Sequence, residues 1–248
     1  MEWNFGKLYF VRTEKLIKNH LFNSAWWGKS VGIVEESKLD SITQEDLDTA
    51  GQTFDWIEAR ATTKTNVNAK RLSDLGFFQV DTQLKFKIRL SQLATTPSLD
   101  NLQVEFADRS PFEIAPCDIK EFAAERFQHL PGCTTSKIKD RYVLWSNQLI
   151  QERPQYCLRV LLSGEVQGFF LSEETATGFR LALAMLHSNA KVTGMHLYQK
   201  ALLAYAEKGI RIGGASFSVH NSPVHNIYAN LGARFLTAER FWFHCLNH

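Results

Sequence analysis

Two short stretches of this chain contain residues whose types and spacing could support chemistry. The first is His187–Leu197, HSNAKVTGMHL, which follows an apolar run and precedes an expected helix. Such a helix start presents backbone N–H groups and the positive end of the helix dipole, which together can hold a diphosphate. Lys191 adds a positive charge, and Gly194 permits close approach of the backbone. We interpret the stretch as a candidate anion-binding loop; the alternative is a plain connecting loop with a chance glycine.

The second stretch is Gly213–Phe235, in which a tyrosine follows a polar corner. Ala215–Val219 is typical of a short buried strand, and Asn221 is a residue type that caps helices. The helix after it contains Tyr228 and ends at Gly232, because glycine readily adopts the left-handed conformation that stops a helix. The pattern predicts a strand and a helix joined by a tight corner, with a phenol available near that corner.

Other titratable side chains surround these stretches, but no spacing defines their role. His187, His220, Glu173 and Glu174 could each relay a proton through water, and a solvated surface group is the alternative for each. His220 and His225 lack a third ligand at a telling spacing, and the four cysteines form no CxxC pair, so we expect no metal site and no disulfide framework. The sequence contains no Gly-x-Ser-x-Gly elbow, which argues against an esterase or lipase.

The composition is that of a globular chain with a substantial core: 248 residues, 44% hydrophobic and 22% charged. A net charge of +2 gives no reason to expect nucleic acid or an anionic membrane as a partner. The longest apolar runs are far shorter than a membrane span, and the start of the chain, MEWNFGKLYFVRTEK, lacks the pattern of a signal peptide. With its scattered cysteines, the sequence predicts a cytoplasmic protein without a membrane partner.

Local signals place helices and strands on both sides of a polar linker at residues 91–101. Before the linker we expect helices at 43–51 and 66–77 and strands at 30–34, 53–61 and 83–90. After it we expect helices within 116–127 and at 137–151, 193–208 and 223–231, strands at 104–106, 156–162, 166–171, 179–186 and 215–219, and a strand or hairpin at 234–247. The central antiparallel hairpin around residues 163–165 excludes a pure Rossmann repeat.

The part of the chain before the linker reads as a shorter copy of the part after it. Asn66–Leu90 gives Asn, helix, Leu-Gly-Phe and strand, and Asn221–Leu246 gives Asn, helix, Leu-Gly-Ala-Arg-Phe and strand. Leu-Gly-Phe after a helix is common by chance, so the match indicates a weak internal repeat. We therefore expect two related α/β halves, the first of them smaller and degenerate.

Leu181–Leu203 followed by Ser216–Phe235 resembles the GCN5-related N-acetyltransferase superfamily. There, a strand feeds a loop of pattern Arg/Gln-x-x-Gly-x-Gly/Ala that grips the pyrophosphate of coenzyme A. Here Gly194 fits that loop, Lys191 replaces its Arg or Gln, and His196 stands where a small residue is usual. The downstream Ile-Tyr-Ala-Asn-Leu-Gly-Ala-Arg-Phe is similar to the family's Leu-Tyr-x-x-Leu-Gly-Phe. The resemblance covers about residues 102–246.

This resemblance implies an α/β (α+β) fold with a mixed, mainly antiparallel sheet flanked by helices, and acetyl-CoA as co-substrate without a metal. It implies a partial domain at 1–95 and a catalytic domain at 102–248. Tyr228 would be the general acid that protonates the leaving thiolate, and Asn221 would lie near the pantetheine or adenosine-diphosphate arm. The implied coenzyme-binding residues are Leu183, Ala184, Leu186, Lys191, Val192, Thr193, Gly194, Met195, His196, Asn221 and Tyr228.

The segment Trp26–Gly32, WWGKSVG, with an incomplete half-domain, is similar to a narrower group, the TDP-fucosamine acetyltransferases. The implied acceptor is the amine of a nucleotide-linked 4-amino sugar, for which cations would be needed. Candidate substrate residues are Trp27, Arg109, Lys137 and Arg141; a core tryptophan and a solvated basic helix face are the alternatives. Another amine (a protein N-terminus, a lysine, an antibiotic) and a non-catalytic ligand-binding protein stay open. The aromatic final strand could pair with a second copy in a homodimer.

Overall fold

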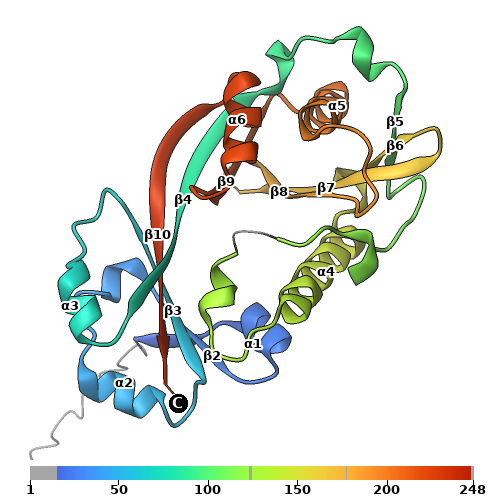
Figure 1. Ribbon diagram of the computed structural model, residues 1–248. Helices are drawn as coiled ribbons and strands as arrows, with labels where there is room; N and C mark the ends of the chain where they lie inside the picture. The colour runs from blue at the N-terminus through green and yellow to red at the C-terminus, as the bar shows by residue number, and fades with distance from the viewer. Residues whose placement is uncertain (1–15, 123–124, 177, 247–248) are drawn as a thin grey trace, which may run out of the picture.

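The residues described by the computed structural model, 16–122, 125–176 and 178–246, form one ten-stranded sheet (Figure 1). The N-terminal stretch in which no signal peptide is expected, residues 1–15, lies outside these residues. The strands are β1 (Ile17–Asn19), β2 (Val31–Val34), β3 (Trp56–Thr62), β4 (Phe78–Arg89), β5 (Leu102–Phe106), β6 (Cys157–Leu162), β7 (Glu165–Thr175), β8 (Gly178–Leu186), β9 (Ile212–Ser218) and β10 (Arg234–Cys245). The helices are α1 (Leu21–Trp27), α2 (Gln44–Ala50), α3 (Ala69–Asp74), α4 (Thr135–Glu152), α5 (Gly194–Glu207) and α6 (Ser222–Asn230).

The sheet is mixed and mainly antiparallel, as expected, because only the pairs β2–β3 and β8–β9 run parallel in the described chain. Helices α5 and α6 pack on one face, in a core that includes Phe86, Tyr198, Tyr205 and Tyr228. Helix α4 packs on the other face, against Phe169, Leu171 and Met185 among others. No helix in the described ranges is long and apolar enough to cross a membrane.

In the middle of this sheet, each half of the sequence contributes a strand that pairs with strands of the other half. The strand order is β1-β2-β3-β10-β4-β9-β8-β7-β6-β5. The last strand, β10, lies between β3 and β4 of the first half, and β4 lies between β10 and β9 of the second half (Figure 1). Both edges of β10 are therefore occupied within the chain. The homodimer stays a prediction, but it would need a surface other than a free edge of this strand.

The weak internal repeat is matched by the topology. In each half a parallel strand pair, β2–β3 or β8–β9, is followed by a short helix, α3 or α6, and then by an exchanged strand. The side chains of Asn68 and Asn221 cap these two helices, accepting the N–H groups of Arg71 and Val224 at 3.0 and 3.3 Å. The capping residue of the first copy is thus Asn68 rather than the expected Asn66.

One expected element is wrong: residues 116–122 and 125–127 do not form the predicted helix. The described part contains a 3-10 turn at Pro116–Asp118, in which the Asp118 carboxylate accepts the N–H of Ala115 at 2.7 Å, and the start of a second 3-10 turn at Arg126–His129. The chain then continues extended and forms a bridge with the end of β8. Tertiary pairing with a strand edge has overridden the amphipathic helical pattern here, as it commonly does for weak local propensities.

Candidate functional site

The strands β8 and β9 pair only at their beginning and then separate. Phe179 faces Gly213 and Arg180 faces Gly214, and no further pair joins the described residues of these strands. Just beyond, Leu183 and Leu181 face consecutive residues of β7, so that Ala182 is the extra residue of a β-bulge. From Leu183 to Leu186, β9 has separated from β8, and the edge of β8 on that side is not paired with β9. We call this stretch of β8 the open edge.

The equivalent strands of the first half stay closed. All four residues of β2, Val31–Val34, pair with β3 at Trp56–Ala59. The first half therefore has a parallel strand pair but no open edge, and only the second half can offer backbone groups to a ligand at this position. This difference separates the two copies of the repeat more clearly than any single side chain.

The loop after β8 is shaped by a buried glutamine. Gln167 is 1% exposed, and its Oε1 accepts the N–H groups of Lys191 and Val192 at 2.7 and 3.3 Å. The exposed ammonium of Lys191 lies 2.7 Å from Glu165. Sequence reasoning missed Gln167; the signal was a polar residue inside the strand VQGFFL, where an amide must find buried partners.

The start of α5 keeps its first N–H groups free of protein acceptors. Thr193 does not cap the helix with its side chain, which instead lies 3.1 Å from Nδ1 of His196. Among the described residues, no acceptor is found for the N–H groups of Gly194, Met195 and His196, and the first turn contains no acidic residue. A Cβ atom at Gly194 would lie 3.1 Å from Cδ1 of Ile227, so this glycine also allows α5 to pack against α6. The arrangement suits an anion at the helix start.

Tyr228 lies in an aromatic core below α6. Its side chain is 5% exposed, and the centroid of its ring lies 4.1 Å from Phe86, 5.4 Å from Tyr198 and 6.0 Å from Phe217. Burial raises the pKa of Tyr228 well above its usual value. The phenol therefore stays protonated at physiological pH and does not act as a base.

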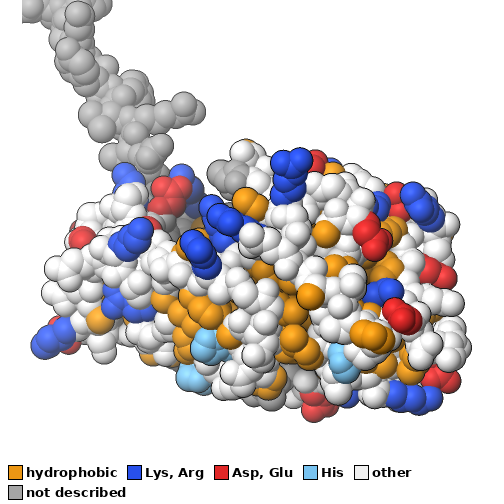
Figure 2. Space-filling view, turned by 90° about the horizontal axis from the view of Figure 1, so that it is seen from above, with side chains coloured by type: hydrophobic (Ala, Val, Ile, Leu, Met, Phe, Trp, Pro, Cys, Tyr) orange, Lys and Arg blue, Asp and Glu red, His pale blue; other side chains and the backbone are white. Residues whose placement is uncertain are grey.

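The side chains of β8 near the open edge alternate between the two faces. Ala184 and Leu186 pack in the core under α5 and α6, whereas Leu183 and Met185 pack on the side of α4. The exposed apolar residues near the following corner are Val219, Phe235 and Leu236. Figure 2 shows hydrophobic and histidine side chains side by side on the face seen from above.

A segment of the same chain is bonded to the end of the open edge. The N–H of His187 donates to β7 at Gln167, so the C=O of Leu186 and the N–H of Ser188 point away from β7. There, the N–H of Ser188 donates to the C=O of Asp118 at 2.8 Å, and the N–H of Lys120 reaches the C=O of Leu186 at 3.4 Å. We call Asp118–Lys120 the edge segment.

The four candidate bases lie at different places. Glu173 and Glu174 face Arg180 and Phe179, at the end of β8 that is still paired with β9, and Glu173 forms an ion pair with Arg180. His187 lies at the open end of β8, with its Nε2 atom 3.9 Å from Asp118. His220 is exposed in the corner before α6. Of the four, only His187 adjoins the open edge.

Of the four predicted substrate residues, Lys137 and Trp27 contact each other, and Arg141 lies one turn further along α4, buried beside Asn23. The Lys137 ammonium lies 3.6 Å from the Trp27 ring centroid, and Arg141 is 7% exposed with its guanidinium hydrogen-bonded to Asn23. Arg109 lies apart, in the turn after β5. A role of these residues in substrate binding stays a prediction.

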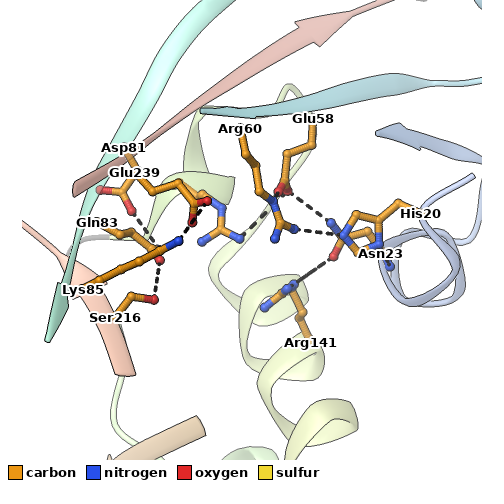
Figure 3. A network of polar contacts seen from close by, with 11 residues as sticks. His20, Asn23, Glu58, Arg60, Asp81, Gln83, Lys85, Arg141, Ser216 and Glu239 are labelled. Carbon is orange, nitrogen blue, oxygen red and sulfur yellow. Dashed lines mark hydrogen bonds and ion pairs between the residues drawn. The ribbon is translucent and has the colours of Figure 1, made fainter. Parts of the chain in front are cut away.

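Two groups of polar residues lie between the sheet and α4 (Figure 3). The first is buried: Glu58 is 0% exposed and pairs with Arg60 and, at 3.9 Å, with Arg126, and it accepts a hydrogen bond from Asn23 at 3.3 Å. Burial opposes ionisation of Glu58, but the charges of Arg126, Arg60 and His20 outweigh it and hold its pKa below its usual value. Burial lowers the pKa of Arg141 to about 10.

The second group comes from the three central strands. It consists of Asp81, Gln83 and Lys85 on β4, Ser216 and Ser218 on β9, and Glu239 on β10. The alternation along β4 indicated a half-buried strand, but nothing in the sequence indicated that these side chains would meet those of β9. The exchange of strands brings them together.

Sequence comparison finds no match to a known family or to a curated protein. The structure, however, is similar to solved structures. A GCN5-related N-acetyltransferase from Sphaerobacter thermophilus aligns with a TM-score of 0.52 and 14% identity, over 78% of this chain and 60% of that chain. The chain thus spans less than two thirds of that protein.

Two further structures align at similar levels. The glucosamine N-acetyltransferase region of a fungal multi-domain β-N-acetylglucosaminidase has a TM-score of 0.56 and 10% identity, over 87% of this chain and 30% of that chain. A conserved protein of unknown function from Staphylococcus epidermidis has a TM-score of 0.53 and 8% identity, over 96% and 94%. The chain therefore has the fold of the GCN5-related N-acetyltransferases, which confirms the predicted fold class.

Proposed function

We propose that this protein is an N-acetyltransferase that moves an acetyl group from acetyl-CoA to a primary amine. The observation that carries the proposal is the open edge of β8 leading directly into the start of α5. An extended ligand with amide groups can add to a strand edge, and a diphosphate can be held by the N–H groups of a helix start. Coenzyme A contains both features in sequence, which is why it fits here.

Different residues would bind the extended arm and the diphosphate of coenzyme A. Leu183, Ala184 and Leu186 would line the extended arm, and Asn221 would lie beside it. The N–H groups of Gly194, Met195 and His196 would hold the diphosphate, with the ammonium of Lys191 nearby and Val192 and Thr193 completing the loop. The side chain of His196 lies 3.1 Å from Thr193. The backbone N–H of His196 has no protein acceptor among the described residues. We therefore propose that histidine, in place of the usual small residue, still allows the diphosphate to bind.

The proposed reaction is a direct transfer. Acetyl-CoA supplies an activated thioester. The neutral amine forms a bond to the acyl carbon, an N–H group near the bulge at Ala182 stabilises the oxyanion, and the carbon–sulfur bond breaks. Tyr228 gives its proton to the leaving thiolate, whose ordinary pKa is close to that of cysteine, about 8.5. The proton released by the amine passes to a base or to water.

For the acceptor we propose a nucleotide-linked 4-amino sugar. The support is the similarity of Trp26–Gly32 to enzymes with such substrates and the amino-sugar acceptor named for one structural neighbour. The four described cysteines are free thiols, which fits a cytoplasmic reaction. Enzymes acting on other amines are the alternatives, and the acceptor assays below separate them.

Acetyl-CoA is expected to raise the melting temperature of the protein. A ligand that binds only the folded state stabilises it by about 2.7 kcal/mol at 100 times its dissociation constant. Thermal unfolding with and without millimolar acetyl-CoA measures this. Lys191→Glu should weaken the effect, and Lys70→Glu, which changes another exposed lysine, paired with Asp74, should not. The absence of any shift in the unmodified protein would refute the proposed function.

The edge segment is expected to compete with the coenzyme, because both need the C=O of Leu186 and the N–H of Ser188. Ile119 and His187 form a directly opposed antiparallel pair, a geometry in which a disulfide can form. In a Cys117→Ser background, oxidised I119C/H187C should lose most of its stabilisation by acetyl-CoA, and dithiothreitol should restore it. The two single variants serve as controls. Equal stabilisation of the oxidised and reduced forms would show that the segment does not obstruct binding.

A further inference from the structure

Strand β4 lies next to β9, the strand that separates from β8 at the open edge. It runs antiparallel to β9, with Gln83 opposite Ser218 and Lys85 opposite Ser216. These side chains lie on the sheet face away from α5 and α6, since the intervening Leu84 and Phe86 pack in the core under those helices. Leu183, next to the bulge of β8, packs on the side of α4 as well. The first half therefore contributes polar side chains to the sheet face on which Leu183 packs, one strand away from β8.

The central group on this surface is the carboxylate of Asp81. The residue is 6% exposed, and the carboxylate accepts hydrogen bonds from Oγ of Ser218 at 2.7 Å and from Nε2 of Gln83 at 3.2 Å. Both donors are neutral. Within the described ranges no cation lies within 4.0 Å of this carboxylate; Arg126 acts on it only from a greater distance. A buried carboxylate held by neutral donors keeps the capacity to bind a cation.

The groups around Asp81 suit hydroxyls. Ser216 donates to Oε1 of Gln83 at 3.1 Å, and Lys85 lies 3.3 Å from Glu239. Ser216 is exposed, and Gln83 and Lys85 are half-buried, so this part of the surface is open to solvent. The region around Glu58, by contrast, is closed by the aromatic rings of Trp26, Trp56, Phe127 and Phe243. Figure 3 shows Asp81, Gln83, Lys85, Ser216 and Glu239 as one group, separate from Glu58.

We propose that Asp81 receives the amino group of the acceptor, and that Gln83, Ser216, Lys85 and Glu239 hold the hydroxyl groups of a sugar-like amine. This inference rests on the proposed function and adds the residue that contacts the reacting nitrogen. As the carbon–nitrogen bond forms, the nitrogen becomes strongly acidic and its proton passes to the Asp81 carboxylate. The carbon–sulfur bond breaks, and the thiolate takes the proton of Tyr228. Each half of the chain thus contributes one of the two proton-transfer groups.

The test compares Asp81→Asn with Asp74→Asn, which changes an exposed carboxylate on α3. Asparagine keeps the size of the side chain and accepts a hydrogen bond from Ser218, but it cannot take a proton. With glucosamine and a TDP-linked 4-amino sugar as acceptors, Asp81→Asn should lower kcat/KM by about 10²-fold. Stabilisation by acetyl-CoA should be unchanged in both variants. Gln83→Leu, which removes a neutral partner only, should raise KM more than it lowers kcat.

Each outcome decides the inference. Unchanged transfer by Asp81→Asn would overturn it. Stabilisation of the unmodified protein by acetyl-CoA, without turnover of either amino sugar, would overturn it and leave the coenzyme proposal intact. Turnover of a lysine peptide but of neither sugar would overturn the assignment of a sugar-like acceptor. If acetyl-CoA does not bind at all, the proposed function fails first, and this inference fails with it.

Discussion

Tyr228→Phe is expected to lower the kcat of acetyl transfer by about 10²-fold or more while leaving the affinity for acetyl-CoA unchanged. The substitution removes one hydroxyl from a ring packed against Phe86, Tyr198 and Phe217 and preserves the packing. Because burial raises the pKa of the phenol, it is protonated whenever the enzyme is active. Its loss leaves the departing thiolate without a proton donor.

The matched control is Tyr198→Phe, which removes a hydroxyl from the same aromatic core on α5. Tyr198 is 6% exposed, and its ring centroid lies 5.4 Å from that of Tyr228. Steady-state kinetics of thiol release should separate the two variants, and thermal shifts with acetyl-CoA should not. Equal turnover of Tyr228→Phe and the unmodified protein would remove the acid role from Tyr228. Equal losses in both variants would indicate that the core as a whole, rather than one proton donor, supports activity.

Glu58→Gln is expected to destabilise the protein by about 3–5 kcal/mol at neutral pH. Glu58 is fully buried and pairs with Arg60 and Arg126, while Arg141 lies close by with only Asn23 as its hydrogen-bond acceptor among the described residues. Neutralising the carboxylate leaves Arg126 and Arg141, which are largely shielded from solvent, without a compensating charge. Urea unfolding measures the loss, and Glu35→Gln, which changes an exposed carboxylate paired with Lys18, should show no measurable change.

The carboxylate of Glu58 also makes the free energy of unfolding depend on pH. The pKa of Glu58 is lowered on folding, so its contribution is fully present above the unfolded value of about 4.3 and is lost as the pH falls through the folded value. The stability difference between Glu58→Gln and the unmodified protein should therefore be largest near neutral pH and shrink below about pH 4. A difference that is constant down to acidic pH would show that the ionised carboxylate is not what stabilises this region.

Much of the second half of the fold could be predicted because its signals are local. The hairpin β6–β7, the buried strand β8 and the helices α5 and α6 follow from turn residues, apolar runs and caps within a few residues of each element. The helix expected within 116–127 failed, because its apolar positions serve an extended segment bonded to β8 instead. Local pattern cannot distinguish these two uses of the same residues.

In the candidate site, too, the residues with a local sequence signal could be predicted, and those that depend on long-range contacts could not. The loop at Lys191–His196 and Tyr228 could be found from sequence, because their spacing repeats a pattern known elsewhere. Gln167 gave only the signal of a polar residue inside a strand, and Asp81 gave none, because its partner Ser218 lies on a neighbouring strand. Asp81 meets Ser218 only through a strand pairing between residues more than a hundred positions apart, and alternation along β4 reveals which face a residue occupies but not which strand lies beside it.

The place of β10 between β3 and β4 also determines when this protein can fold. During synthesis, β3 and β4 leave the ribosome long before residues 234–245, which must lie between them. Until then both strands present unpaired edges, which are sites of misassociation. The first half therefore cannot complete its sheet until residues 234–245 have been synthesised. Pairings of such long sequence separation form slowly, so these edges stay exposed through most of the synthesis of the described chain.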